Sequence, residues 1–126
     1  MTAPAPGLLL RHRTPALLLG SVRDFDGAVL RCASLGDGPF PWHALLEGAA
    51  QCAGLLAGLQ MDGLDDTAVI AEYRDVIVHT GGHGGPVTFV ARLDRRVLRF
   101  WRCRVEVHAA DEAILLQGLV TVAPRR

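Results

Sequence analysis

Three polar side chains suited to acid–base chemistry stand in a mostly apolar stretch, residues 40–61. His43, Glu47 and Gln51 follow one another at intervals of four residues, so a helix would present them on one face. Glu47 carries the only formal charge of the stretch. An unpaired charge among buried residues is costly, and such a carboxylate is usually functional or paired. We therefore expect Glu47 to be a catalytic acid or base, with His43 as its partner.

The rest of this stretch predicts one long buried helix. Most of its other side chains are small or aliphatic, and a helix that is apolar nearly all round is buried nearly all round. Pro41 fits the first turn, where its missing N–H costs nothing. Each glycine lowers helix propensity by about 0.5–1 kcal/mol relative to alanine, which makes sense where another backbone comes very close. A membrane span is the competing interpretation, but the ionisable residues and the lack of a nearby basic flank argue against it.

Alternating apolar and polar residues predict strands before and after this helix. Asp26-Gly27 is a strong hairpin signal between the first two strands. Antiparallel strands around a single helix make an α+β domain. We expect the hotdog fold, in which an antiparallel six-stranded sheet wraps around one long central helix. The predicted strands cover residues 16–24, 28–34, 67–79, 87–94, 97–108 and 113–123.

The segments outside these elements give further expectations. Residues 1–126 suit a single domain, with a loose tail at 1–7. A polar loop at 62–66 ends the helix. The glycine-rich segment 79–86 is predicted to be a loop and not a strand.

Half of the residues are apolar and about a fifth are charged, which is typical of a globular protein. The formal net charge is zero, so bulk charge gives no argument for binding nucleic acid or an anionic membrane.

Three widely spaced cysteines, Cys32, Cys52 and Cys103, lie in apolar settings. Their odd number indicates buried, reduced thiols in a cytoplasmic protein. The first residues lack an early basic region and a continuous apolar core, so we predict no signal peptide.

Two segments resemble the β-hydroxyacyl-ACP dehydratases of fatty-acid synthesis. Residues 10–19, LRHRTPALLL, look like the family's Leu-Pro-His-Arg-x-Pro-x-Leu-Leu-Leu opening, and residues 47–54, EGAAQCAG, are similar to its Glu-x-x-Ala-Gln-x-x-Gly helix motif. The resemblance implies a pocket at a dimer interface, with Glu47 in the carboxylate role and Gln51 as the neighbouring polar group. It also implies a substrate carried on the phosphopantetheine of an acyl carrier protein or of coenzyme A, with no other cofactor.

The sequence departs from this family at the catalytic histidine. In the family that histidine lies in a His-Phe-Pro-Gly-His-Pro loop of the partner subunit, but the corresponding segment here, residues 38–43, is shortened to GPFPWH. His43 either takes over the histidine's role, orients Glu47 or is incidental, and the sequence leaves these alternatives open. The entry with Pro41 and Trp42 just before the glutamate resembles dehydratase-like proteins of aryl-polyene and polyketide clusters.

Dehydration of a β-hydroxyacyl thioester needs a base at the α-carbon, an acid for the leaving hydroxyl and donors for the thioester carbonyl. A carboxylate in a dry tunnel suits the acid–base work, and free N–H groups at the helix start could polarise the carbonyl. The same groups would serve a thioesterase. A third alternative is a degenerate subunit that binds acyl chains or supports an active paralogue. Trp42 and Tyr73 are candidate substrate contacts, although core or interface packing is the simpler interpretation.

Other features are weaker. His79 and His83 are spaced for a helix but lie among glycines, so we predict no metal site there. Six arginines between residues 92 and 104 form a solvated face or a docking patch for an acidic carrier or a pantetheine phosphate. In the strand at 67–79, Val69, Ala71 and Tyr73 should share one side. An uncovered sheet edge predicts a homodimer with a continuous sheet, or a heterodimer with a paralogue.

Overall fold

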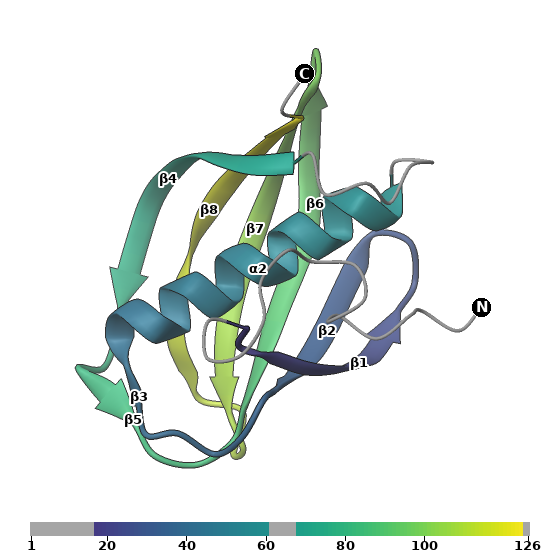
Figure 1. The fold of residues 1–126 in the computed structure, drawn as a ribbon. Coiled ribbons are helices and arrows are strands. Elements are labelled where there is room, and N and C mark those ends of the chain that lie inside the picture. Colours follow the sequence, from purple (N-terminus) through teal and green to yellow (C-terminus); the bar gives the residue numbers. More distant parts are fainter. Residues whose placement is uncertain (1–16, 61–67, 125–126) are drawn as a thin grey trace.

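One long helix lies in the curve of a six-stranded antiparallel sheet (Figure 1). The computed structural model describes residues 17–60 and 68–124. The order of strands across the sheet is β1-β2-β6-β7-β8-β4, and β3 pairs with β5 in a separate two-stranded sheet. This arrangement confirms the predicted α+β hotdog fold. The elements are β1 (Leu19–Phe25), β2 (Val29–Ser34), β3 (Phe40–Pro41), α2 (Trp42–Gln60), β4 (Ala68–Val78), β5 (Gly82–His83), β6 (Val87–Val97), β7 (Phe100–Ala109) and β8 (Ile114–Pro124).

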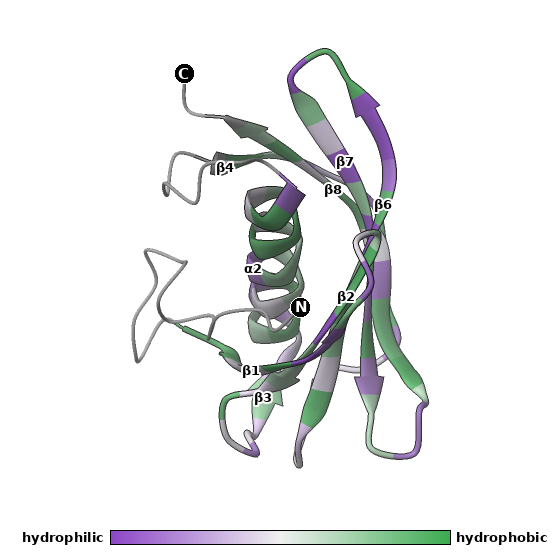
Figure 2. Cartoon of the chain, turned by 90° about the vertical axis from the view of Figure 1, so that its right-hand side faces the viewer, coloured by the Kyte–Doolittle hydropathy of each residue, from purple (hydrophilic) through white to green (hydrophobic). Residues whose placement is uncertain are grey.

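Alternation along the central strand β7 separates a helix side of the sheet from an outer side. In β7, Cys103, Val105 and Val107 are fully buried, and the residues between them are less buried or exposed. Figure 2 shows the same alternation of hydrophobic and hydrophilic residues along the strands, beside a largely hydrophobic α2. Removing this apolar surface from water supplies most of the stabilisation of the fold.

Gly48 allows a close approach to the helix, but of a side chain and not of the backbone that we expected. A Cβ atom at this position would overlap the ring of Phe89 on β6, so only glycine lets the helix lie this near the sheet. Gly54 differs, because no described atom lies within 4 Å of where its Cβ would be. The expected approach of another backbone is therefore seen at neither glycine, although Gly48 is required by the Phe89 ring.

The first two predicted residues of the helix belong to a strand. Phe40 pairs with His83 and Pro41 with Gly82, so α2 begins at Trp42 and part of the segment predicted as a loop is the strand β5. The Trp42 N–H donates to the carbonyl of Gly81 at 3.1 Å. A strand of this length is too short to show the alternation of apolar and polar residues that predicts strands. The glycines of the segment 79–86 therefore led to the prediction of a loop.

The hairpin between β6 and β7 is longer than predicted. Its turn is Leu98-Arg99, and Leu98 has a φ of 55° and is 85% exposed. A left-handed conformation normally calls for glycine or asparagine, so the sequence lacked a turn signal here. The first hairpin was predicted correctly, because the Asp26 carboxylate accepts hydrogen bonds from the N–H groups of Ala28 and Val29 at 3.0 and 2.8 Å.

Two irregularities in β4 overturn the expected side-chain pattern of this edge strand. The register with β8 shifts between Ile70 and Glu72, and again between Arg74 and Ile77. Val69 pairs with Ala123 and Tyr73 with Val120, neighbours that lie on opposite sides of β8. Val69 and Tyr73 therefore face opposite sides of the sheet, because a bulge shifts the alternation by one residue.

Some predictions fall outside the described residues. The tail at 1–7, most of the segment 10–19 and the loop at 62–66 are among them. Within the described ranges, the structure contains no helix long and apolar enough to cross a membrane.

Candidate functional site

Glu47 and Gln51 lie together on one face of α2, as predicted from their spacing. The Gln51 side-chain amide donates from Nε2 to Glu47 Oε1 at 3.3 Å. Gln51 is only 3% exposed and is the one buried polar side chain found in residues 17–60 and 68–124. Glu47, one turn earlier, is half-buried. The helix thus carries a carboxylate near the surface with a buried amide behind it.

A backbone group from the start of the described chain fixes the orientation of that amide. The Leu18 N–H donates to Gln51 Oε1 at 2.8 Å. Because an N–H can only donate, the oxygen of Gln51 must face Leu18 and its NH₂ group must face Glu47. Gln51 therefore positions the Glu47 carboxylate. The contribution of Leu18 was missed because a backbone donor has no signature in the sequence.

Tyr73 lies on the helix side of the edge strand β4, within electrostatic reach of Glu47. Its register partner Val120 is a core residue, which places the phenol on the side of the sheet that faces α2. Partial burial, followed by the negative charge of Glu47, raises the pKa of Tyr73. The side chain is still 43% exposed. Tyr73 is thus a protonated phenol at the rim of the Glu47 site.

Trp42 and His43 form the exposed end of the helix. Their rings meet edge to face, with centroids 6.0 Å apart and planes at 84°. Trp42 is 44% exposed and His43 is also exposed. The Trp42 N–H, one of the groups expected to polarise a thioester carbonyl, is used by the Gly81 carbonyl. Any carbonyl site at this helix end must therefore use later N–H groups.

The three cysteines are buried, as predicted, and Cys52 and Cys103 are poor nucleophiles. Burial, followed by the neighbouring Cys32 thiol, raises the pKa of Cys52 well above its usual range. Burial, followed by the charge of Asp94, raises the pKa of Cys103 to about 12. A thiol must ionise to attack or to bind a metal. Residues 17–60 and 68–124 hold no group of three or more His, Cys, Asp or Glu side chains that could bind a metal ion.

Comparison with solved structures places this chain among hotdog-fold proteins. The dehydratase heterocomplex ApeI:P from Xenorhabdus doucetiae matches with a TM-score of 0.82 and 17% identity, over 98% of this chain and 93% of that one. A mutant thioesterase from Pseudomonas aeruginosa matches with a TM-score of 0.65 and 18% identity, over 82% and 78%. A thioesterase from Haemophilus influenzae matches with a TM-score of 0.58 and 9% identity, over 83% and 78%. No protein-family model and no curated protein matches the sequence.

Proposed function

We propose that the protein dehydrates β-hydroxyacyl thioesters, with Glu47 as its catalytic acid or base. The observation that carries the proposal is the oriented carboxylate of the central helix: Gln51, locked by the Leu18 N–H, donates to Glu47. A carboxylate held in one orientation and partly shielded from water is suited to proton transfer. The similarity to a dehydratase heterocomplex over nearly the whole chain supports the same reaction class.

The reaction removes a proton from the α-carbon and the hydroxyl from the β-carbon. Glu47 would take the α-proton and deliver it to the β-hydroxyl as the C–O bond breaks, so the hydroxyl leaves as water and Glu47 is again a carboxylate. The product is an enoyl thioester. His43 is the proposed proton-exchange partner of Glu47, and Trp42 and Tyr73 are the proposed substrate contacts around it. The raised pKa of Tyr73 keeps its hydroxyl protonated, so it could donate a hydrogen bond to the substrate.

The thioester carrier would dock on the arginine hairpin, which we define as residues 92–104 of β6 and β7. These residues hold six arginines and one carboxylate, hence a formal charge of +5 in a neutral chain. Two arginine pairs are directly opposite across the strands, Arg92 with Arg104 and Arg95 with Arg102. Like charges in such positions are destabilising. Asp94 lies 3.9 Å from Arg102 and 3.6 Å from Arg104, so one carboxylate offsets part of the repulsion, and an acidic carrier protein or the phosphates of coenzyme A would offset the rest.

The pocket would be completed by a second chain along β4. This strand ends the sheet and exposes Tyr73, Ile77 and Val78, so it leaves both backbone groups and apolar side chains unpaired with any described strand. Pairing along β4 would bring a second chain beside the Glu47 site. The second chain is either another copy, which gives a homodimer, or a paralogue, which gives a heterodimer. The similar dehydratase is itself a heterocomplex.

Two other functions are compatible with the same fold. Thioesterases share the architecture, and in that case Glu47 would activate water or attack the thioester carbonyl. The resemblance to a heterocomplex favours a further alternative, in which the chain binds acyl groups and supports an active paralogue.

A turnover assay separates these three functions. A β-hydroxyacyl-pantetheine thioester is incubated with the wild type, with Glu47→Gln and with Glu72→Gln. Mass spectrometry detects loss of water and a thiol reagent detects hydrolysis. Glu72 is an exposed carboxylate of β4 that pairs with Arg74 at 3.6 Å, so its amide variant controls for the loss of one charge.

Loss of water that disappears in Glu47→Gln but persists in Glu72→Gln is the expected result. Release of thiol without loss of water would replace the dehydratase with a thioesterase. If the protein shows no turnover, either alone or together with a candidate paralogue, the two enzymatic functions are excluded and acyl binding remains. Thermal unfolding of each variant shows whether a loss of activity is a loss of folding.

A further inference from the structure

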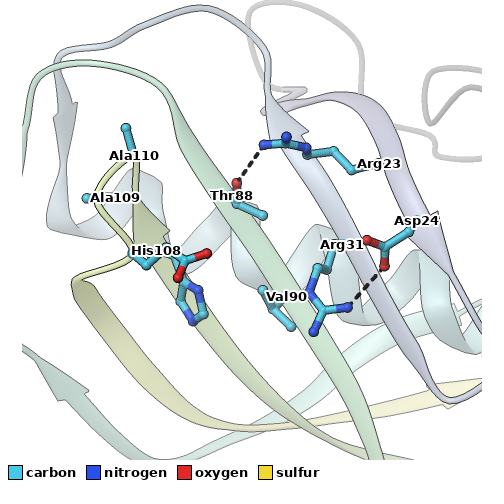
Figure 3. A pocket seen from close by; sticks show the side chains of 9 residues that line it. Arg23, Asp24, Arg31, Thr88, Val90, His108, Ala109 and Ala110 are labelled. Atoms are coloured by element: carbon cyan, nitrogen blue, oxygen red, sulfur yellow. Dashed lines mark hydrogen bonds and ion pairs between the residues drawn. The ribbon is translucent and has the colours of Figure 1, made fainter.

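The outer side of the sheet contains a depression that the chemistry at Glu47 does not use. It has a volume of about 410 Å³ and lies across β1, β2, β6 and β7, next to the turn that follows β7 (Figure 3). Arg31 pairs with Val90 and Thr88 with His108 across these strands. Their chain neighbours Cys32, Phe89 and Val107 are core residues on the helix side, so the depression opens on the opposite side of the sheet.

The floor of the depression is more enclosed than an outer sheet surface normally is. Val90 is only 3% exposed, although it lies outside the core that packs against α2. Figure 3 shows the Arg31 side chain beside Val90, and Arg23 extending toward Thr88. The volume falls within the range of about 300–1,000 Å³ that is usual for small-molecule sites.

Each of four neighbouring strands supplies one polar side chain to this depression. These side chains are Arg23 from β1, Arg31 from β2, Thr88 from β6 and His108 from β7. Arg31 pairs with Asp24 at 3.0 Å and is neutralised by it. His108 is held by Glu106, with 3.0 Å between Nε2 and the carboxylate.

Arg23 differs from the other cationic donor. Within the described ranges it makes no ion pair, and its one hydrogen bond is a long contact of 3.5 Å with the Thr88 hydroxyl. The guanidinium can accept a carboxylate through two parallel N–H groups. Asp24 and Glu112 also line the depression, so two carboxylates balance the two arginines. This balance disfavours a polyanion and suits a ligand with a single negative charge and further polar groups.

We infer that this depression is a binding site for a small hydroxylated or aminated carboxylic acid. The ligand carboxylate would pair with Arg23 and accept a hydrogen bond from the Thr88 hydroxyl. The hydroxyl or amino groups of the ligand would face Glu112, Asp24 and His108. The site is on the opposite side of the sheet from Glu47, so it does not depend on the proposed dehydration. A Glu47→Gln variant should bind the same ligand unchanged.

The probe is glycerate, a hydroxylated monocarboxylate, followed by amide NMR of the full chain. Glycerate should cause saturable shifts of the Thr88 and His108 amides, with a Kd in the millimolar range that is usual for such a small ligand. Glycerol, which lacks the carboxylate, should not. Arg23→Gln should weaken binding about tenfold or more, because a charge-assisted pair is lost. Arg99→Gln, at the exposed turn between β6 and β7, is the matched control and should bind as the wild type does.

Three results would overturn the inference. If sodium chloride causes the same amide chemical shift changes as glycerate, the changes are an effect of ionic strength and not of glycerate binding. Equal shifts with glycerol would remove the role of the carboxylate. Tighter binding of inorganic phosphate than of glycerate would assign the site to phosphorylated compounds. Arg23→Gln and Arg99→Gln spectra with native dispersion ensure that lost binding does not reflect lost folding.

Discussion

The helix side and the outer side of the sheet are built from the same strands but are held by different forces. On the helix side, neutral groups touch closely: Gly48 leaves no room beyond the Phe89 ring, and the Cys52 thiol lies 3.6 Å from the Phe89 carbonyl oxygen. On the outer side, charged groups lie opposite one another, as the exposed Arg95 and the partly buried Arg102 do. The contrast implies that helix-side substitutions have large effects on catalysis and stability, whereas outer-side substitutions mainly change binding and have small effects on stability.

The largest expected effect compares one carboxylate from the helix with one from the outer side. Glu47→Gln should lower the rate of dehydration by about 10²–10⁴-fold, the usual contribution of a positioned acid or base. Glu106→Gln, which breaks only the pair with His108, should leave the rate unchanged. Steady-state turnover of the two variants measures both. Equal losses of dehydration rate in the two variants would mean that catalysis does not depend specifically on the helix side of the sheet.

The second comparison uses two glycines of α2. Gly48→Ala should destabilise the protein by about 1–3 kcal/mol, because the new methyl overlaps the Phe89 ring. Gly54→Ala should stabilise it by about 0.4–1 kcal/mol, because no described atom opposes the methyl and alanine restricts the unfolded chain. Urea unfolding gives both values. A stabilising Gly48→Ala would show that the helix is not seated against β6 as tightly as described.

The third prediction tests the helix side through pH. The pKa of Cys103 rises from 9.0 to about 12 on folding, so above pH 9 the unfolded chain releases a proton that the folded chain keeps. Stability from this thiol is complete below pH 9 and is lost as the pH rises toward 12. Between pH 9 and pH 12 this thiol makes the free energy of unfolding decrease by up to about 1.4 kcal/mol per pH unit. Cys103→Ala should lack this part of the decrease. An unchanged slope would mean that the thiol is not shielded from water.

The smallest effect is expected on the outer side. Arg95→Gln removes one of two like charges that face each other, and should raise stability by about 0.2–1 kcal/mol. The same change should weaken binding of an acidic carrier protein, measured by titration calorimetry at low salt. Arg99→Gln at the turn is the control for stability. A clear loss of stability in Arg95→Gln would show that Arg95 stabilises the fold, which contradicts the expected repulsion between the two arginines.

The sequence predicted those parts of the fold that depend on periodicity. The apolar stretch around Glu47 identified the buried helix, and the alternation from Arg102 to His108 identified β7. The grouping of Glu47 with Gln51 followed from helical spacing alone. These features need only local rules, so one sequence was enough to find them.

The features that the sequence missed depend on contacts between distant segments. Asp75 has a φ of 55° within the second irregularity of β4, opposite the space left by Gly118 on β8. The pairing of Phe40 with His83, and the hydrogen bond from Leu18 to Gln51, likewise join residues far apart in the chain. No local pattern specifies such partners, because they are chosen only when the whole domain packs.

The pairing of β3 with β5 links the edge of the large sheet to the start of the central helix. Residues 79–81 connect the end of the edge strand β4 to the carbonyl that receives the Trp42 N–H at the start of α2. The edge at which we propose assembly and the helix that carries Glu47 are thus tethered by three residues. A change in the length of this short connector would therefore alter the edge proposed for assembly and the placement of Glu47 together.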